Sequence, residues 1–400
     1  MIVNKKWKFI LDMGLNIGAV SAPIAILQLL IYPYLAKHLS AEEYGLMITM
    51  YSMWIVVSNS IGNVLNNIRL LRSSEYEENS LQGDFPLILY KWGGINVIII
   101  LIASIFYLKG FFLINILYSI LIATLILLKS YFEVGLRIKL NYVAILFNGL
   151  LQSAGFVIGL CVFYFTGVWQ AVFIFGFSFC VCFTILKTGM LKEQSKKTML
   201  YDTVNRDVNL YTIATFSNSS MSYADKLVLY PLMGGHVVSI YYTATILGKI
   251  VSMVSGPITS VILSYISKWN RDKKSIFSKV LILGGGLAII GYVITMLISR
   301  PVIELLFPQW LDEVMIYIPI TTVAIVIQTL NSFLNPFILK FYDIKWQIVI
   351  NIISVSVYFL GSLILWHFYG MIGFCVGTIV GHAAKTLIMV LLHFNAEKGV

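Results

Sequence analysis

Four lysine side chains lie inside long apolar stretches of this sequence and could bind a charged ligand there. They are Lys91, Lys226, Lys249 and Lys385. If these stretches cross a membrane, a lysine at the bilayer centre costs about 2.5–3.5 kcal/mol, so a deep lysine must face water or a partner. Lys249 is central in its stretch and is predicted to face a hydrated cavity. Lys385 could instead reach the membrane surface, and Lys226 could pair with Asp225. Because lysine binds phosphate as a point charge, the chemistry indicated is anion binding.

Polar side chains also recur at helical spacing in the same stretches. Each such stripe can line a hydrated passage or join neighbouring helices by hydrogen bonds, and for a single stripe the sequence leaves both open. Five stripes together with the embedded lysines favour a hydrated, cationic passage suited to phosphate or pyrophosphate. The stripes are Asn59, Asn63 and Asn66, ending beside Arg69; Asn218, Ser222 and Asp225; Thr245, Lys249 and Ser252; Gln328, Asn331 and Asn335; and Thr378, His382 and Lys385.

The candidate site is therefore a set of binding residues, and no covalent chemistry is indicated. The sequence contains no Gly-x-x-x-x-Gly-Lys-Ser/Thr loop for ATP, and its histidines lack metal-ligand spacing. No catalytic residue, metal site or cofactor is predicted. The predicted substrate-binding residues are Lys249, Lys226, Asp225, Lys385, Arg69, Asn63, Asn218 and Asn331.

The elements that must position these residues are apolar runs of about 20 residues. Charged residues make up 12% of the 400 residues and hydrophobic residues 59%. A helix of about 20 residues crosses the hydrocarbon core of a bilayer, so the sequence predicts an all-α integral membrane protein with about twelve transmembrane helices. The predicted spans are 13–36, 44–66, 85–108, 111–128, 142–164, 168–186, 209–231, 238–263, 276–299, 314–338, 346–367 and 370–392.

The distribution of Lys and Arg predicts the orientation. Of the 28 such residues, 21 lie at the two ends of the chain, in alternate gaps between spans or, for Lys279 alone, at the fourth residue of the span that follows such a gap. Three lie in the opposite gaps and four lie deeper within spans. By the positive-inside rule both termini are cytoplasmic. This bias also accounts for the net charge of +10, and it points to membrane lipids, above all anionic headgroups, rather than nucleic acid as partners.

The longest cytoplasmic gap divides the chain into two halves. We predict an N-terminal six-helix bundle at 1–190, a cytoplasmic linker at 191–208 and a C-terminal six-helix bundle at 209–400. A spacing of 198 residues supports a repeat, since it relates Tyr32-Pro33 to Tyr230-Pro231, His38 to His236, and Tyr44 to Tyr242. Halves of six spans share one orientation, an arrangement that is common in transporters working by alternating access.

Two smaller expectations concern glycine and cysteine. Gly284, Gly285 and Gly286 lie within a span and are expected to allow close helix packing. Cys180 and Cys182 also lie in a span and are expected to be small core residues.

Four segments carry a resemblance to a known family. Residues 33–46 read Pro-Tyr-Leu-Ala-Lys-His-Leu-Ser-Ala-Glu-Glu-Tyr-Gly-Leu, and this segment resembles the first external turn of bacterial O-antigen and polysaccharide flippases. The step Asp225-Lys226-Leu227, the segment 239–244 and the run Leu305-Leu306-Phe307 are similar to segments of the same family. The family belongs to the multidrug/oligosaccharidyl-lipid/polysaccharide exporter superfamily, which includes multidrug extruders and lipid II flippases.

The resemblance implies a MATE-like, V-shaped fold of two six-helix bundles. It implies a flippase that moves undecaprenyl-pyrophosphate-linked O-antigen repeat units, or units of a related surface polysaccharide, from the cytoplasmic to the periplasmic leaflet of the bacterial inner membrane. Lys249 and Lys226 would contact phosphate, with Lys385 and Arg69 as further candidates. The O-antigen polymerase and the chain-length regulator of lipopolysaccharide synthesis are the expected partners. An H⁺ or Na⁺ gradient, or consumption of the product, would supply the energy, and the sequence leaves these open.

Two other functions are compatible with a protein of this kind. A multidrug or cation antiporter of the same fold would need a deep carboxylate, and the predicted spans of the first half contain none. A membrane-embedded glycan polymerase or acyltransferase would need a large external loop. The largest external gap here, at about 300–313, is too short for that role.

Overall fold

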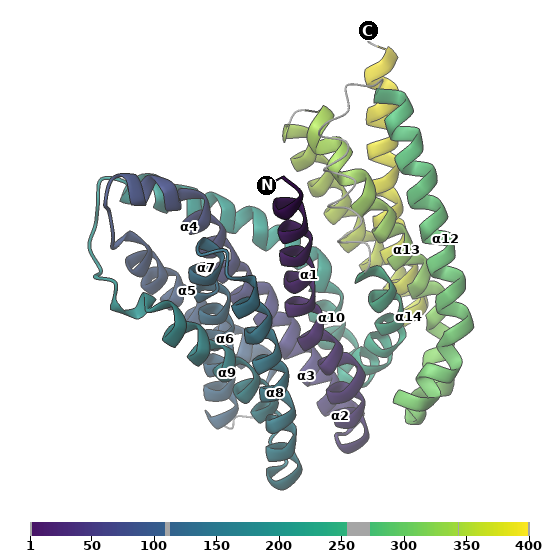
Figure 1. Cartoon of the computed structure of the whole chain (residues 1–400). Coiled ribbons are helices and arrows are strands. Elements are labelled where there is room, and N and C mark those ends of the chain that lie inside the picture. Colours follow the sequence, from purple (N-terminus) through teal and green to yellow (C-terminus); the bar gives the residue numbers. More distant parts are fainter. Residues whose placement is uncertain (1, 109–112, 254–272, 343, 399–400) are drawn as a thin grey trace. The chain divides into compact units, whose positions relative to one another are not determined.

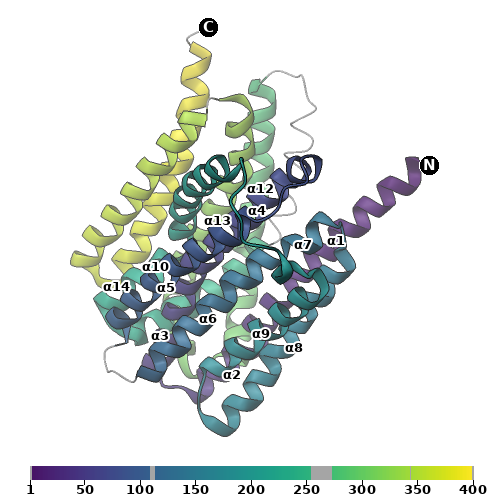
Figure 2. The same ribbon diagram turned by 90° about the vertical axis from the view of Figure 1, so that its left-hand side faces the viewer.

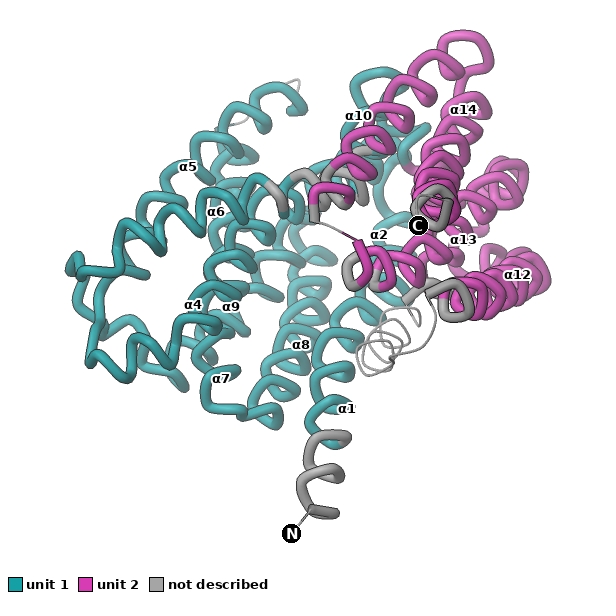
Figure 3. Tube along the Cα trace, turned by 90° about the horizontal axis from the view of Figure 1, so that it is seen from above, with its two compact units in different colours: residues 1–238 teal, residues 239–400 magenta. Residues whose placement is uncertain are grey.

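The structure, a computed structural model, describes residues 2–108, 113–253, 273–342 and 344–398, which form helices joined by turns and short connecting segments (Figure 1). These residues contain no β-strand. They form two compact units, unit 1 at residues 1–238 and unit 2 at residues 239–400 (Figure 3). Helices satisfy their own backbone hydrogen bonds, which is what a chain of apolar runs requires inside a membrane.

Unit 1 contains most of the shorter helices (Figure 1). The first candidate span bends after Pro23, which has no N–H to donate, and then passes through a π-helical turn. The elements are α1 (Ile2–Ile26), η1 (Leu27–Ile31), α2 (Tyr32–His38), α3 (Ala41–Trp54), η2 (Ile55–Asn59), α4 (Ser60–Glu78), α5 (Asp84–Tyr107), α6 (Leu113–Phe132), α7 (Val134–Ile138), α8 (Tyr142–Thr166), α9 (Gln170–Thr188), η3 (Met190–Lys192) and part of α10 (Tyr201–Met253).

Small residues bring the helices of unit 1 close together. Helix α8 lies between α1 and α9 (Figures 1 and 2). A Cβ added at Gly149 of α8 would lie 2.3 Å from the carbonyl oxygen of Ala19 in α1, and one at Gly159 would lie 2.5 Å from the Cα of Val172 in α9. Such glycines allow backbones to approach where lipid provides no hydrophobic drive for association.

Helix α10 bends at Gly234, where φ is 82°. We call residues 201–233 its first arm and residues 235–253 its second arm. The first arm forms three hydrogen bonds with α4 and α5: Arg72 with Asp207 at 2.8 Å, Ser60 with Ser219 at 2.8 Å, and the hydroxyl of Tyr107 with the carbonyl of Leu227 at 2.9 Å. The segment 209–238, which the sequence assigns to the second bundle, therefore packs in unit 1, and the compact units divide after Val238 instead of at 191–208.

Unit 2 comprises residues 239–253 of the second arm of α10 with α12 (Lys273–Leu306), η4 (Pro308–Trp310), α13 (Leu311–Phe341) and α14 (Ile344–Lys398). Helix α13 lies between α12 and α14 (Figure 3). Helix α14 bends at Gly370, where φ is 57°, and its two parts pack together. Gly373, Gly377 and Gly381 form one stripe on this contact, since a Cβ at each would meet Leu365, Ser362 or Tyr358 at 2.6 Å or less.

The twelve predicted spans agree with these helices. Most spans overlap one helix or one part of a bent helix, whereas 13–36 and 44–66 each cover two helices joined by a π-helical turn. Residues 111–112 and 254–263 of the predicted spans lie outside the described ones. Within the described residues, nine segments are long and apolar enough to cross a membrane. One of the nine, Val349–Phe394, contains the bend of α14 and so holds two predicted spans. Helix α10 is not among the nine, in keeping with the polar run at 217–222.

Two smaller expectations need correction. Of the three consecutive glycines, Gly284 packs against Leu330 and Phe333 of α13, whereas a Cβ at Gly285 or Gly286 would meet nothing within 4 Å. Consecutive residues point about 100° apart around a helix, so three in a row cannot share one contact. Of the two cysteines, Cys180 is buried, but Cys182 is exposed on the outer surface of α9.

The spacing of 198 residues aligns the two Tyr-Pro steps but not the turns that follow them. His38 is the last residue of α2, and the chain turns just after it. The corresponding turn is at Gly234, so His236 already lies in the second arm of α10. The two histidines therefore lie on opposite sides of their turns.

Candidate functional site

The Asp225–Lys226 pair lies in the first arm of α10. The Nζ of Lys226 lies 2.7 Å from Oδ1 of Asp225 and 5.8 Å from the ring centre of Tyr223. The Lys226 side chain is 1% exposed, so its charge is neutralised by its neighbour away from solvent. Pairing with Asp225 was one of the arrangements that the sequence left open, and it is the one observed.

Lys385 and Asn331 lie close together in unit 2. The Nζ of Lys385 donates to Oδ1 of Asn351 at 3.0 Å, so this partner is a neutral amide. Asn331 of α13 donates to the carbonyl of His382 at 2.9 Å and accepts from the hydroxyl of Thr386 at 2.7 Å. Two predicted stripes thus meet across the contact between α13 and α14, next to Lys385.

Lys249 lies in the second arm of α10, also in unit 2. Its side chain is half-buried, and its Nζ is 5.9 Å from the ring centre of Tyr242. The residue before it, Gly248, packs against Ile325 of α13. A lysine ammonium at this distance from an aromatic ring is attracted to the ring face. Of its predicted stripe, Thr245 donates to the carbonyl of Tyr242 in its own helix, and the side chain of Ser252 lies outside the described residues.

The asparagine stripe of unit 1 joins two helices. Oδ1 of Asn59 accepts from the hydroxyl of Ser130 in α6 at 2.8 Å, and Nδ2 of Asn66 donates to the carbonyl of Ser130 at 2.7 Å. Asn63 lies between them on the same helix and is half-buried. Of the two roles open to this stripe, the structure shows interhelical contact for its two outer members. The side chain of Asn218 lies outside the described residues.

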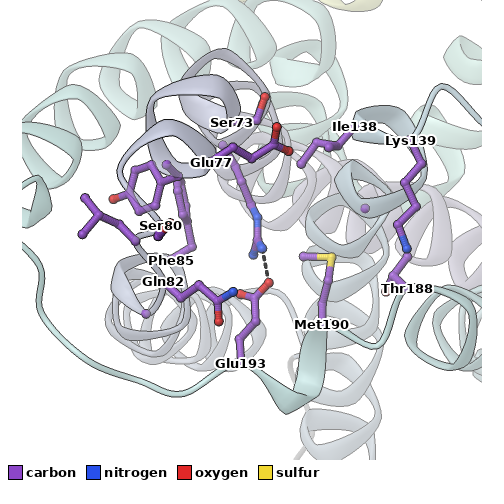
Figure 4. A pocket seen from close by; sticks show the side chains of 15 residues that line it. Ser73, Glu77, Ser80, Gln82, Phe85, Ile138, Lys139, Thr188, Met190 and Glu193 are labelled. Atoms are coloured by element: carbon purple, nitrogen blue, oxygen red, sulfur yellow. Dashed lines mark hydrogen bonds and ion pairs between the residues drawn. The ribbon is translucent and has the colours of Figure 1, made fainter.

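Arg69 borders a cavity of about 600 Å³ at one end of unit 1 (Figure 4). Its guanidinium donates to the hydroxyl of Tyr131 at 2.6 Å, forms an ion pair with Glu193 and lies 5.3 Å from the ring centre of Phe85. Among the predicted binding residues whose side chains the structure describes, Arg69 alone borders this cavity. The lining residues are Arg69, Ser73, Tyr76, Glu77, Ser80, Leu81, Gln82, Gly83, Phe85, Gly135, Ile138, Lys139, Thr188, Met190 and Glu193.

One wall of the cavity is fixed by a buried carboxylate that sequence reasoning missed. Asp84 is 0% exposed and accepts hydrogen bonds from the hydroxyl of Tyr76 at 2.6 Å, the backbone N–H of Thr198 at 2.7 Å and the hydroxyl of Thr198. Beside this carboxylate, the backbone N–H of Lys196 donates to the carbonyl of Gly83 at 3.3 Å. In the sequence, Asp84 stands out only as an acidic residue near the start of a predicted helix. Its partner Thr198 is 114 residues away, so the local pattern does not indicate their contact.

Comparison with known proteins shows the fold. No family model matches the chain, and no curated protein matches it in sequence. The structure of the lipid II flippase MurJ in an inward closed conformation is similar, with a TM-score of 0.76 and 13% identity over 95% of this chain and 87% of that one. A MATE transporter in the straight conformation has a TM-score of 0.65 at 14% identity, covering 99% and 97% of the two chains. An outward-facing multidrug resistance MATE transporter of the MOP superfamily has 0.64 at 14% identity, covering 97% and 95%.

These likenesses confirm the predicted all-helical, MATE-like membrane fold. The apolar helices and the fold together make the chain a multi-pass membrane protein. At 13–14% identity they show the fold alone.

Proposed function

We propose that the protein is a flippase for undecaprenyl-pyrophosphate-linked oligosaccharides. It would move O-antigen or related surface-polysaccharide repeat units from the cytoplasmic to the periplasmic leaflet of the inner membrane by alternating access. The observation that carries the proposal is the likeness to a lipid II flippase along 95% of the chain, with a TM-score of 0.76 against 0.65 for a MATE transporter. The flippase resemblance of residues 33–46 points the same way.

The charges of the buried residues favour an anionic cargo. The buried carboxylates that the structure describes are Asp84, Glu133 and Asp225, and each is held by its own partners. A cation antiporter of this fold would need a carboxylate open to the transported cation, so these contacts disfavour that function. Lys249 and Lys385 contact an aromatic ring and a neutral amide, and their charges suit a pyrophosphate.

In this proposal, Lys249 and Lys385 contact the pyrophosphate and the polyprenyl tail remains in lipid. Lys226 contributes less than the sequence suggests, because Asp225 already neutralises it. Both termini are cytoplasmic, transfer is coupled to an H⁺ or Na⁺ gradient, and the O-antigen polymerase and chain-length regulator receive the product. No bond is made or broken in the transfer, so the protein acts as a transporter and not as an enzyme.

The test is a lipopolysaccharide ladder from a strain that lacks this gene. We expect the ladder to disappear, lipid-linked single repeats to accumulate on the cytoplasmic leaflet, and a plasmid copy to restore the ladder. Lys249→Ala should reduce ladder synthesis about tenfold or more, the loss expected for one charge-assisted hydrogen bond, and Lys249→Arg should retain part of it. Lys279→Ala, on an exposed position of α12, is the matched control.

An unchanged ladder and unchanged capsule in the deletion strain would overturn the proposal. Increased sensitivity of that strain to cationic drugs would then favour the antiporter.

A further inference from the structure

The cavity beside Arg69 lies wholly within unit 1, whereas the proposed cargo contacts Lys249 and Lys385 lie in unit 2. It is formed by the end of α4, the turn at 79–83, α7 and the segment 188–193 (Figure 4). A volume of about 600 Å³ is within the range of small-molecule sites. The cavity can therefore bind a ligand other than the cargo.

The charges around the cavity are balanced. Arg69 and Lys139 supply two positive charges, and Glu77 and Glu193 supply two negative ones. Arg69 and Glu193 form an ion pair and are largely buried, whereas Lys139 and Glu77 are exposed at the rim. A pyrophosphate, which carries only negative charge, suits a net positive cavity. A molecule with a phosphate and an ammonium group suits a balanced one, because each charge finds its opposite.

Two exposed leucines lie beside the cavity in sequence. Leu140 follows the lining residue Lys139 and is 62% exposed, and Leu191 follows Met190 and is 64% exposed. Leu140 also has a φ of 50°, in the left-handed region that leucine rarely adopts. Its backbone is held there because its N–H donates to the carbonyl of Arg137 at 3.0 Å. In a bilayer these side chains would contact acyl chains next to a polar, charged cavity.

We propose that the cavity binds the headgroup of a zwitterionic phospholipid with a primary ammonium group, of the phosphatidylethanolamine class. The phosphate would contact Lys139, and the ammonium would donate to the carboxylate of Glu77 and the amide oxygen of Gln82, while Arg69 keeps its ion pair with Glu193. The acyl chains would lie along Leu140. A primary ammonium is favoured over a quaternary one because the rim offers oxygen acceptors, and only the primary group has N–H bonds to donate.

Lipid binding to the purified full-length protein tests this proposal. Short-chain phosphatidylethanolamine, phosphatidylglycerol and phosphatidylcholine would be titrated separately, and bound lipid would be counted by native mass spectrometry. We expect saturable binding of phosphatidylethanolamine with the lowest Kd of the three. Glu77→Gln and Lys139→Ala should each raise that Kd about tenfold, since each removes one charge-assisted contact.

Matched controls lie close by. Glu78→Gln and Lys192→Ala change exposed residues at the same end of unit 1 that do not line the cavity, and both should leave the Kd unchanged. Equal effects in the control and test variants would overturn the proposal. So would equal binding of phosphatidylcholine, tighter binding of phosphatidylglycerol, or displacement of the lipid by inorganic pyrophosphate, which would assign the cavity to the cargo. None of these measurements depends on the ladder assay, so either proposal can fail without the other.

Discussion

The carboxylate of Glu42 accepts two hydrogen bonds from the backbone at the start of the second arm of α10. Oε1 lies 2.9 Å from the N–H of Gly235, and Oε2 lies 3.0 Å from the N–H of His236. Backbone N–H groups in the first turn of a helix have no partner within it, and the positive end of the helix dipole favours an anion there. Glu42, in the first turn of α3, thus caps a helix that begins almost 200 residues later.

Glu42→Ala should therefore destabilise the protein. Glu42 and His236 are exposed and Gly235 is buried, so we expect a loss of about 1–2 kcal/mol, in the range of a helix cap. Thermal unfolding in detergent measures the change. Glu304→Ala, at an exposed position of α12, should have little effect, and an equal shift in this control would show that Glu42 does not act as a cap.

Gly45 and Gly235 hold the same two helices in close contact. A Cβ added at Gly45 would lie 1.9 Å from the carbonyl oxygen of Gly235, closer than atoms can approach. Gly45→Ala should cost at least about 3 kcal/mol, because backbone on both sides must move. Gly93→Ala is the matched control in α5, where a Cβ would meet nothing within 4 Å. The folded yield of the two variants compares them, and equal yields would contradict the close contact.

The sequence predicted the helices well because each signal was local. An apolar run of about 20 residues between charge clusters specifies a membrane helix by its own composition. Glycine packing was harder to predict. Gly284, Gly285 and Gly286 drew attention as a run, yet the closer stripe is Gly373, Gly377 and Gly381, whose spacing of four places all three on one side of a helix.

Long-range pairs could not be predicted from one sequence. Arg69 is an evident candidate for anion binding, but its partner Glu193 is 124 residues away, and nothing in the local pattern relates them. The packing of residues 209–238 with α4 and α5 depends on contacts such as Arg72 with Asp207, which are 135 residues apart. The division into two halves of six spans stays a prediction from the hydropathy pattern, whereas the compact units divide after Val238.

Asp84 should be needed to hold the segment before α10. Its carboxylate accepts from the backbone and hydroxyl of Thr198, and an amide in its place would put N–H donors opposite these donors. Asp84→Asn should cost about 1–3 kcal/mol and should free the segment at Lys196 and Lys197 for tryptic cleavage. Asp202→Asn, at an exposed position nearby, is the control. If trypsin cuts both variants at the same rate, Asp84 does not restrain the segment.

The first arm of α10 should cross-link to α4. The hydroxyl oxygens of Ser60 and Ser219 are 2.8 Å apart, so cysteines at both positions can form a disulfide with a small shift. In a chain whose four native cysteines are replaced, S60C with S219C should oxidise readily, as seen by mobility on a non-reducing gel. S60C with I213C, where Ile213 is 70% exposed on another side of the arm, should not. Equal cross-linking of the two pairs would contradict the packing of this arm in unit 1.

Lys226 and Lys249 should fail in different ways when replaced. Lys226→Ala removes the ion-pair partner of the buried Asp225 carboxylate, which costs about 3–5 kcal/mol, so this variant should unfold at a lower temperature and accumulate poorly. Replacing Asp225 as well should restore most of the stability, because no buried charge remains. Lys249→Ala removes a half-buried lysine beside Tyr242 and should leave the unfolding temperature nearly unchanged while reducing ladder synthesis. Thermal unfolding and the lipopolysaccharide ladder, measured on the same three variants, separate the two roles. If Lys249→Ala lowers the unfolding temperature as much as Lys226→Ala does, then Lys249 is a structural residue and the proposed cargo contact must lie elsewhere.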